Sequence, residues 1–254
     1  MPKNILIFAD GTGQAGGVRP DQQLSNIYKL YRATRVGPDS PIDPAEQVAF
    51  YDPGLGTAMA GGDVRLSLWQ RLKSIAGLAV GLGFSSNVIE CYEAILKRYE
   101  PGDRIFLFGF SRGGYTVRSL ANVLNLCGVP TTDGQGRPLP RAGRKLRAIA
   151  KEAVVRVYEH GAGRPRNKYE AQREALAHRF RLKYQAGENS ARGDVYSEFI
   201  GVFDAVAALG LPWPARIALG SAGMIAMAVV TAALSWISSA WLDWNFEAVF
   251  GALL

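Results

Sequence analysis

Short apolar runs alternate with amphipathic stretches along most of this chain. Four runs have the length and composition of buried strands: residues 5–9, 47–51, 104–108 and 195–203. Helical spacing of apolar residues predicts helices over 24–33 and over 85–99, the second with Ser85 or Ser86 as its N-cap. Strands that alternate with helices predict an α/β fold, built on a doubly wound and mostly parallel sheet.

One strand-to-helix junction carries a chemical signature. Gly109-Phe110-Ser111-Arg112-Gly113 follows the run 104–108, and a helical apolar face that ends near Gly128 comes after it. A strand, a G-x-S-x-G turn and a helix in this order form the nucleophile elbow of the α/β-hydrolases, in which a strained turn exposes a serine hydroxyl. The pattern therefore predicts an α/β-hydrolase-like fold with Ser111 as the nucleophile.

The other parts of an acyl-transfer site can be sought at the ends of the predicted strands. The backbone N–H of Arg112, the residue after the nucleophile, is the expected first donor to the oxyanion. A second donor is expected from the loop Gly11-Thr12-Gly13, whose glycines allow close approach. Asp204 follows the last predicted strand and fits the acid that orients the base; its alternative role is that of a turn or helix-cap aspartate.

The general base is the missing part of this constellation. The chain contains two histidines, His160 and His178, and both precede Asp204. We favour reading both as exposed histidines of a basic segment, so the catalytic histidine is unknown.

Two other chemistries have partial motifs. Residues 11–16 match G-x-G-x-x-G, but loop-forming residues follow where a dinucleotide fold starts a helix, and Asp10 would repel phosphates. A D-x-D-G-T phosphatase is excluded because Phe8 stands at the position of the nucleophilic aspartate. We expect no cofactor and no metal, and we interpret Cys91 and Cys127 as small buried hydrophobes.

Positive charge is concentrated in one part of the sequence. The chain has a net charge of +7, and residues 137–192 contain fifteen Lys or Arg and five Glu. This stretch is interpreted as a solvated helical insertion that covers the carboxyl ends of the strands as a lid. The alternative is a surface that attracts anionic lipid head groups. Nucleic acid is not an expected partner, because no nucleic-acid-binding motif accompanies the charge.

A long uncharged segment follows the predicted hydrolase-like domain. Residues 217–242 carry no charge, and this stretch is long enough to cross a bilayer. Arg216 and Asp243 flank it. We therefore predict two parts, a domain over 1–212 and a transmembrane-like helix with its tail over 213–254. Arg216 favours a cytoplasmic location for the first part, so membrane association on that side is the expected localisation.

Four segments together resemble a known family. They are Phe8-Ala9-Asp10-Gly11-Thr12-Gly13, Tyr51-Asp52-Pro53-Gly54-Leu55-Gly56-Thr57, Gly109-Phe110-Ser111-Arg112-Gly113-Gly114-Tyr115-Thr116-Val117-Arg118 and Gly201-Val202-Phe203-Asp204-Ala205-Val206. Over residues 3–212 the chain is similar to the α/β-hydrolase family DUF2235, which contains the Tle1-like phospholipase effectors of type VI secretion. The resemblance implies a lipase-type fold with Ser111 as nucleophile and Asp204 as acid.

The family's catalytic histidine lies beyond the aspartate motif, in a segment that this chain does not contain. Either the membrane segment interrupts a longer hydrolase domain, or the chain is a shortened homologue without a working triad. The leading hypothesis is a membrane-associated serine hydrolase of acyl esters such as phospholipids. The alternative is a catalytically incomplete module that binds lipid or a partner protein at a membrane.

Overall fold

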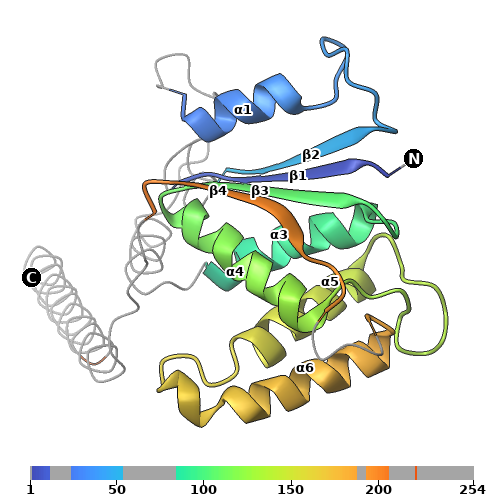
Figure 1. Ribbon diagram of the computed structural model, residues 1–254, viewed down its shortest axis with the longest axis vertical. Helices are drawn as coiled ribbons and strands as arrows, with labels where there is room; N and C mark the ends of the chain where they lie inside the picture. Colours follow the sequence, from blue (N-terminus) through green and yellow to red (C-terminus); the bar gives the residue numbers. More distant parts are fainter. Residues whose placement is uncertain (1, 12–23, 54–83, 188–192, 206–220, 222–254) are drawn as a thin grey trace, which may run out of the picture. The chain divides into compact units, whose positions relative to one another are not determined.

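The computed structural model describes residues 2–11, 24–53, 84–187, 193–205 and 221 of the chain. The chain divides into two compact units, Met1–Gly210 and Leu211–Leu254. All the strands and helices named below belong to the first unit (Figure 1).

A four-stranded parallel sheet forms the centre of this unit. Its strands are β1 (Asn4–Ala9), β2 (Gln47–Asp52), β3 (Arg104–Phe110) and β4 (Ser197–Phe203), in the order β2-β1-β3-β4. All three pairings are parallel, and Asn4 lies in register with both Gln47 and Arg104. Residues 5–9 of β1 are buried, as expected for a strand covered on both faces. The α/β fold with a parallel sheet is confirmed.

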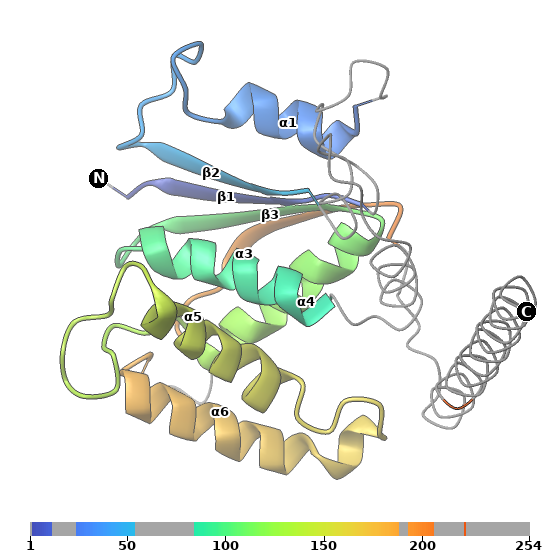
Figure 2. The same cartoon turned by 180° about the vertical axis from the view of Figure 1, so that it is seen from behind.

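Helices cover both faces of the sheet (Figures 1 and 2). One face carries α1 (Asn26–Thr34), and the other carries α3 (Phe84–Arg98) and α4 (Arg112–Cys127). A small apolar cluster of Leu6, Phe8 and Ile27 lies under α1. The larger core lies on the other face and joins the sheet to α3, α4 and the helices beyond them.

The basic stretch supplies a third layer. It contains α5 (Arg144–Lys151), a π-helical segment (Glu152–Tyr158), a short 3-10 turn (Arg166–Lys168) and α6 (Glu170–Tyr184). These helices pack on α3 and α4, on the side away from the sheet (Figures 1 and 2). The expectation that this helical stretch covers the strand ends as a lid is therefore wrong. Its apolar residues, such as Leu146 and Phe180, are part of the larger core, which fixes the layer there.

Both predicted helices are present, but the predicted cap of the second is wrong. Ser25 is the N-cap of α1, and its hydroxyl accepts a hydrogen bond from the Tyr28 N–H at 3.0 Å. Helix α3 begins at Phe84, so Ser85 and Ser86 lie inside it. Their hydroxyls donate instead to Glu159 and Glu90, at 2.6 and 3.1 Å. A serine pattern alone does not separate a cap from a first-turn residue with a carboxylate partner.

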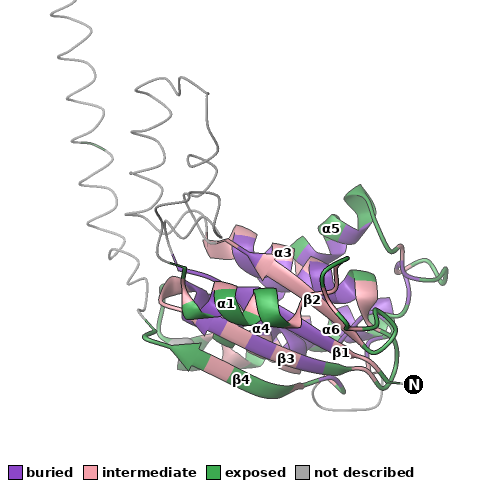
Figure 3. Ribbon diagram, turned by 90° about the horizontal axis from the view of Figure 1, so that it is seen from above, coloured by how far each residue is buried: buried purple, intermediate pink, exposed green. Residues whose placement is uncertain are grey.

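Strand β4 lies at one edge of the described sheet and is the most exposed strand (Figure 3). Phe199, Ile200, Val202 and Phe203 each keep more than a third of their surface accessible. The predicted strand is present, but its apolar side chains are less buried than those of β1.

The predicted membrane helix cannot be assessed in the same way. Within the described residues, no helix is both long enough and apolar enough to cross a bilayer. Apart from Ser221, the uncharged segment 217–242 lies outside those residues. The transmembrane-like helix is therefore not supported by the structure.

Candidate active site

A sharp turn between β3 and α4 contains the predicted nucleophile. Strand β3 ends at Phe110, α4 begins at Arg112, and Ser111 between them has φ 52° and ψ −119°. A positive φ is uncommon for a residue other than glycine and is a form of stored backbone strain. The junction thus has the strand–turn–helix arrangement that the sequence predicted around Ser111.

The two glycines of the motif are required by close backbone contacts. A Cβ added at Gly109 would lie 2.4 Å from the carbonyl oxygen of Gly113. A Cβ added at Gly113 would lie 2.0 Å from the carbonyl oxygen of Ala9, in the neighbouring strand β1. Because no side chain fits at either position, the glycines let α4 start directly against the ends of β1 and β3.

Hydrogen bonds bring the end of β4 to the same turn. The Ser111 N–H donates to the carbonyl oxygen of Phe203 at 2.9 Å, and the Gly114 N–H donates to the Ser111 carbonyl oxygen at 3.1 Å. Asp204, which follows Phe203, also has a positive φ of 44° and is exposed. Asp204 thus directly follows Phe203, the residue that accepts the Ser111 hydrogen bond. Its role as the orienting acid stays a prediction.

Arg112 offers two groups next to Ser111. Its N–H belongs to the first turn of α4, where no preceding helical carbonyl can accept it. Its guanidinium is half-buried, and the resulting desolvation lowers the arginine pKa from its usual value. A donor and a cation at a helix N-terminus favour negative charge at this point.

The loop after β1 is only partly described. A Cβ added at Gly11 would lie 3.2 Å from the Ser111 Cβ, so Gly11 lies beside the serine. The Gly11 N–H, however, donates to Asp10 Oδ1 at 2.8 Å. An oxyanion would have to compete with this carboxylate for Gly11, and Thr12 and Gly13 lie outside the described residues.

Asp10 is a buried residue of this region to which the sequence alone gave no role. Only 2% of its surface is exposed. Its Oδ2 accepts hydrogen bonds from the Ser25 hydroxyl and from the Tyr51 hydroxyl, the latter at 2.8 Å. Burial and then the Asp10 hydrogen bond raise the pKa of Tyr51 far above its usual value, so this phenol remains a donor. An aspartate directly after an apolar strand was the available signal, but its partners are distant in sequence.

A second buried carboxylate, Asp52, ends the neighbouring strand β2. Its carbonyl oxygen accepts from the Asp10 N–H at 2.9 Å, and its Oδ2 lies 3.9 Å from Cys91 Sγ. Burial and the Asp52 charge raise the pKa of the Cys91 thiol, and burial does the same for Cys127. Both thiols are free and buried, which confirms their interpretation as small core residues. The described part of the chain contains no group of three residues suited to hold a metal ion.

Both histidines lie in or beside the third layer. His160 Nε2 is 3.0 Å from Gln172 Oε1, and its ring contacts Tyr169 edge-on. His178 is exposed on α6. Among the described contacts, neither histidine reaches Ser111 or Asp204, so the general base of the predicted triad is not identified.

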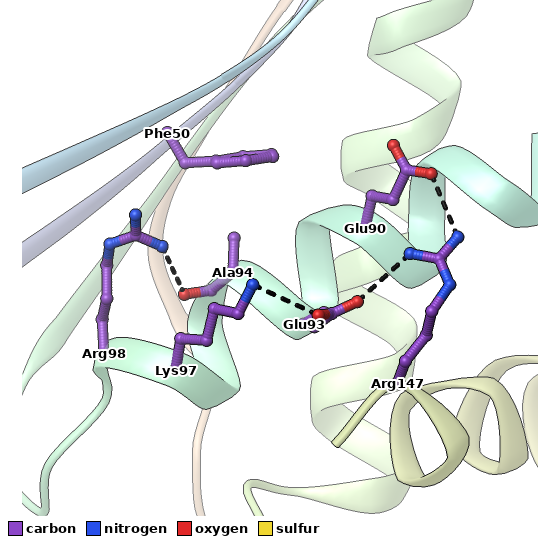
Figure 4. A pocket seen from close by; sticks show the side chains of 7 residues that line it. All are labelled: Phe50, Glu90, Glu93, Ala94, Lys97, Arg98 and Arg147. Atoms are coloured by element: carbon purple, nitrogen blue, oxygen red, sulfur yellow. Dashed lines mark hydrogen bonds and ion pairs between the residues drawn. The ribbon is translucent and has the colours of Figure 1, made fainter. Parts of the chain in front are cut away.

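A cavity of about 250 Å³ lies elsewhere, between β2, α3 and α5 (Figure 4). Phe50 and Ala94 line it together with five charged residues, Glu90, Glu93, Lys97, Arg98 and Arg147. Arg147 forms ion pairs with Glu90 and Glu93, each at 3.2 Å, and Lys97 pairs with Glu93 at 3.2 Å (Figure 4). These ion pairs tie α5 to α3, while Arg98 donates to the Ala94 carbonyl oxygen, and none of these residues belongs to the predicted site.

The parallel sheet with helices on both faces places the chain among α/β proteins, with Ser111 at a strand-to-helix turn. Over residues 3–238 it matches the family described as T6SS, phospholipase effector Tle1-like, catalytic domain. Because the match spans most of its length, the chain belongs to this family.

One curated relative extends well beyond the matched region. The chain is 29% identical over 213 residues to the uncharacterized protein YEL023C of Saccharomyces cerevisiae. The match covers 82% of this chain and 27% of the yeast protein, so the chain spans about a quarter of that relative's length. No solved structure matches the chain significantly.

Proposed function

We propose that this protein is a serine hydrolase that cleaves acyl esters of lipids, with phospholipids as its substrate class. The observation that carries the proposal is the strained Ser111 between β3 and the N-terminus of α4. Membership of a family of phospholipase effector catalytic domains supports the lipid substrate.

The proposed chemistry follows from the groups around the serine. The Ser111 Oγ attacks the ester carbonyl carbon and transfers its proton to a base, while the Arg112 N–H donates to the carbonyl oxygen as it becomes negative. Collapse of the tetrahedral intermediate breaks the bond to the alcohol, which leaves with that proton. Water then hydrolyses the acyl-serine by the same steps, which restores Ser111 and releases the fatty acid.

Asp204 is proposed to orient the base and to stabilise its charged form. The base itself is proposed to be a histidine from outside the 254 residues, because both histidines of the chain precede Asp204. This assignment agrees with the engagement of His160 by Gln172 and with the exposure of His178.

Membrane association is part of the same proposal. The uncharged residues 217–242 have the length of a bilayer span, and Arg216 before them favours a cytoplasmic location of the hydrolase part. Fractionation of the expressed chain measures this. Recovery as a monodisperse species without detergent would contradict membrane association.

A second function is favoured by one observation, the absence of a histidine contact to Ser111 in the described residues. The chain would then be a catalytically incomplete module that binds lipid or a partner protein at a membrane. It would bind phospholipid vesicles, but it would not turn over any ester.

Fatty-acid release from phospholipid vesicles separates these functions. We expect a form of the protein that also supplies a histidine downstream of Asp204 to release fatty acid. The 254-residue chain should show little or no release, because a triad without its base keeps only residual catalysis. In the active form, Ser111→Ala should reduce the rate at least about 10³-fold, whereas Ser86→Ala should not.

Two results would change the proposal. Full activity of Ser111→Ala would remove the serine mechanism. Robust turnover by the 254-residue chain would assign the base to His160 or His178. Replacing each histidine with alanine would then identify which one.

A further inference from the structure

The carboxylate of Asp10 takes no part in the hydrolytic steps proposed above, although it lies at the strand end beside Ser111. It is buried, and three donors bind it: the Gly11 N–H at 2.8 Å, the Tyr51 hydroxyl at 2.8 Å and the Ser25 hydroxyl. A carboxylate with three donors is a satisfied hydrogen-bond acceptor.

These donors come from separate elements of the fold. Ser25 caps α1, where its hydroxyl also accepts from the Tyr28 N–H at 3.0 Å, and Tyr51 belongs to β2. The hydrogen bonds of the Asp10 side chain therefore connect the carboxyl end of β1 to α1 and β2.

The backbone of the same residue faces α4. A Cβ added at Gly113 would lie 2.0 Å from the Ala9 carbonyl oxygen and 2.8 Å from that of Asp10. On the next residue, a Cβ added at Gly11 would lie 3.2 Å from the Ser111 Cβ. Any movement of the end of β1 would thus change the packing of the first turn of α4 and of Ser111.

We propose that Asp10 is a positioning residue for Ser111. Its carboxylate, held by Ser25 and Tyr51, fixes the end of β1 against the first turn of α4. Ser111 is thereby kept in its strained conformation at the N-terminus of that helix. The inference rests on the proposed function only in taking Ser111 as the reactive residue.

The physical basis is that a strained conformation persists only where its surroundings fix it. Ser111 has φ 52°, and hydrogen bonds hold its N–H and carbonyl oxygen on the β4 and α4 sides. Among the described residues, packing of Gly11 and Gly113 holds the β1 side, and the Asp10 hydrogen bonds make that side rigid. Without them, residue 111 can relax and turn its side chain away from the N–H groups of α4.

A cysteine in place of the serine makes this positioning measurable without a general base. In a Ser111→Cys background, the thiol lies at the N-terminus of α4, which lowers the thiolate pKa. Its alkylation by iodoacetamide as a function of pH reports that pKa. Cys91 and Cys127 are buried with raised pKa values, so the signal comes from residue 111.

The sign of the effect distinguishes positioning from direct charge repulsion. Asp10→Asn removes a negative charge near residue 111, which by Coulomb repulsion alone would lower the thiol pKa and speed alkylation. Lost positioning raises the pKa, and we expect alkylation near pH 7 to slow about three- to ten-fold. Tyr51→Phe keeps the charge and loses one anchor, so it should slow the reaction in the same direction by a smaller factor.

Asp103→Asn is the matched control. The Asp103 side chain is also buried and also accepts backbone N–H bonds, from Lys3 and Glu100 at 2.9 Å each, but it lies at the amino end of the sheet. Its replacement should lower stability without changing alkylation of the thiol introduced at residue 111. Circular dichroism of each variant verifies that it is folded, and Tyr51→Phe carries the test if Asp10→Asn does not fold.

Faster or unchanged alkylation in both the Asp10→Asn and Tyr51→Phe variants would overturn the proposal. The measurement needs neither a histidine nor a substrate. A protein that fails to hydrolyse any lipid would contradict the proposed function and leave this result interpretable.

Discussion

The two ends of the sheet hold a buried aspartate side chain in different ways. At the amino end, Asp103 forms an ion pair with Lys3 at 2.6 Å and accepts two backbone N–H bonds. At the carboxyl end, Asp10 is held by hydroxyls and one backbone N–H, and no cation of the described residues contacts it. Lys3 neutralises the charge of Asp103, whereas the carboxylate of Asp10 lies in the interior beside the predicted nucleophile without a cation among the described residues.

Backbone strain also differs between the amino and carboxyl ends of the sheet. Near the amino end, the positive φ falls on Gly102, around which a Cβ would meet nothing within 4 Å. Three non-glycine residues of the described chain have positive φ, and two of them, Ser111 and Asp204, lie at the carboxyl end. Strain and unneutralised charge thus gather where the sequence predicts chemistry, as expected if stability is sacrificed there for a reactive geometry.

The strongest test of this contrast is Gly113→Ala, at the carboxyl end. The new Cβ would meet backbone atoms of β1 that cannot move aside. We expect a loss of about 3 kcal/mol or more in the free energy of unfolding, measured by urea denaturation. At Gly37, an added Cβ meets the flexible side chains of Arg35 and Asp39, so Gly37→Ala should cost far less. Equal losses would contradict the backbone-contact explanation.

Asp10→Ala should have the next largest effect. The change leaves the Ser25 and Tyr51 hydroxyls and the Gly11 N–H without their buried acceptor. The expected loss is about 2–3 kcal/mol, measured by the same denaturation experiment. Little or no loss would mean that water replaces the carboxylate and that the end of β1 is not held by it.

The stabilisation that Asp103 provides at the amino end of the sheet should be lost in acid. Burial raises the pKa of Asp103, but hydrogen bonds and charge from Lys3 outweigh it, so the folded-state pKa is lower than usual. The stabilisation is therefore present above the unfolded pKa near 4 and is lost as the pH falls through the folded value. Asp103→Asn should cost about 1–2 kcal/mol at neutral pH.

Measurement of unfolding at several pH values checks this prediction. The difference between Asp103→Asn and the unmodified chain should shrink as the pH falls below about 4 toward the lower folded-state pKa, at which the native carboxylate becomes protonated. A difference that grows in acid would contradict the assigned direction.

The smallest effect is expected in the cavity between β2, α3 and α5. Arg147 pairs with Glu90 and Glu93, and about half of its side chain is accessible to solvent. Arg147→Ala should cost less than about 1 kcal/mol, and the loss should decrease in high salt. A larger loss that is independent of salt would show that packing of the arginine stem, rather than its charge, ties α5 to α3.

The strands and the turn at Ser111 were predictable from the sequence because their signals are local. The run 5–9 is apolar throughout, which indicates a strand buried on both faces, and the glycines around Ser111 are adjacent to the turn that requires them. Local periodicity and turn chemistry therefore sufficed for much of the parallel sheet.

The remaining features depend on contacts between distant residues. The position of the basic helices on α3 and α4, rather than over the strand ends, follows from apolar faces whose partners are far away in sequence. The Asp10 hydrogen bonds reach Ser25 and Tyr51, and no spacing rule connects these three residues. The uncharged segment 217–242 stays a prediction, since it lies almost entirely outside the described residues.

The strand order also has a consequence during protein synthesis. Of the four strands that the structure describes, β1 is synthesised before the others, and its two neighbours begin at residues 47 and 104. At roughly 5–20 residues per second, its apolar side chains wait about 5–20 s before β3 is translated. For that interval the most buried strand of the finished sheet is unprotected, so the yield of folded protein should depend on chaperones that bind nascent chains and should improve at lower growth temperatures.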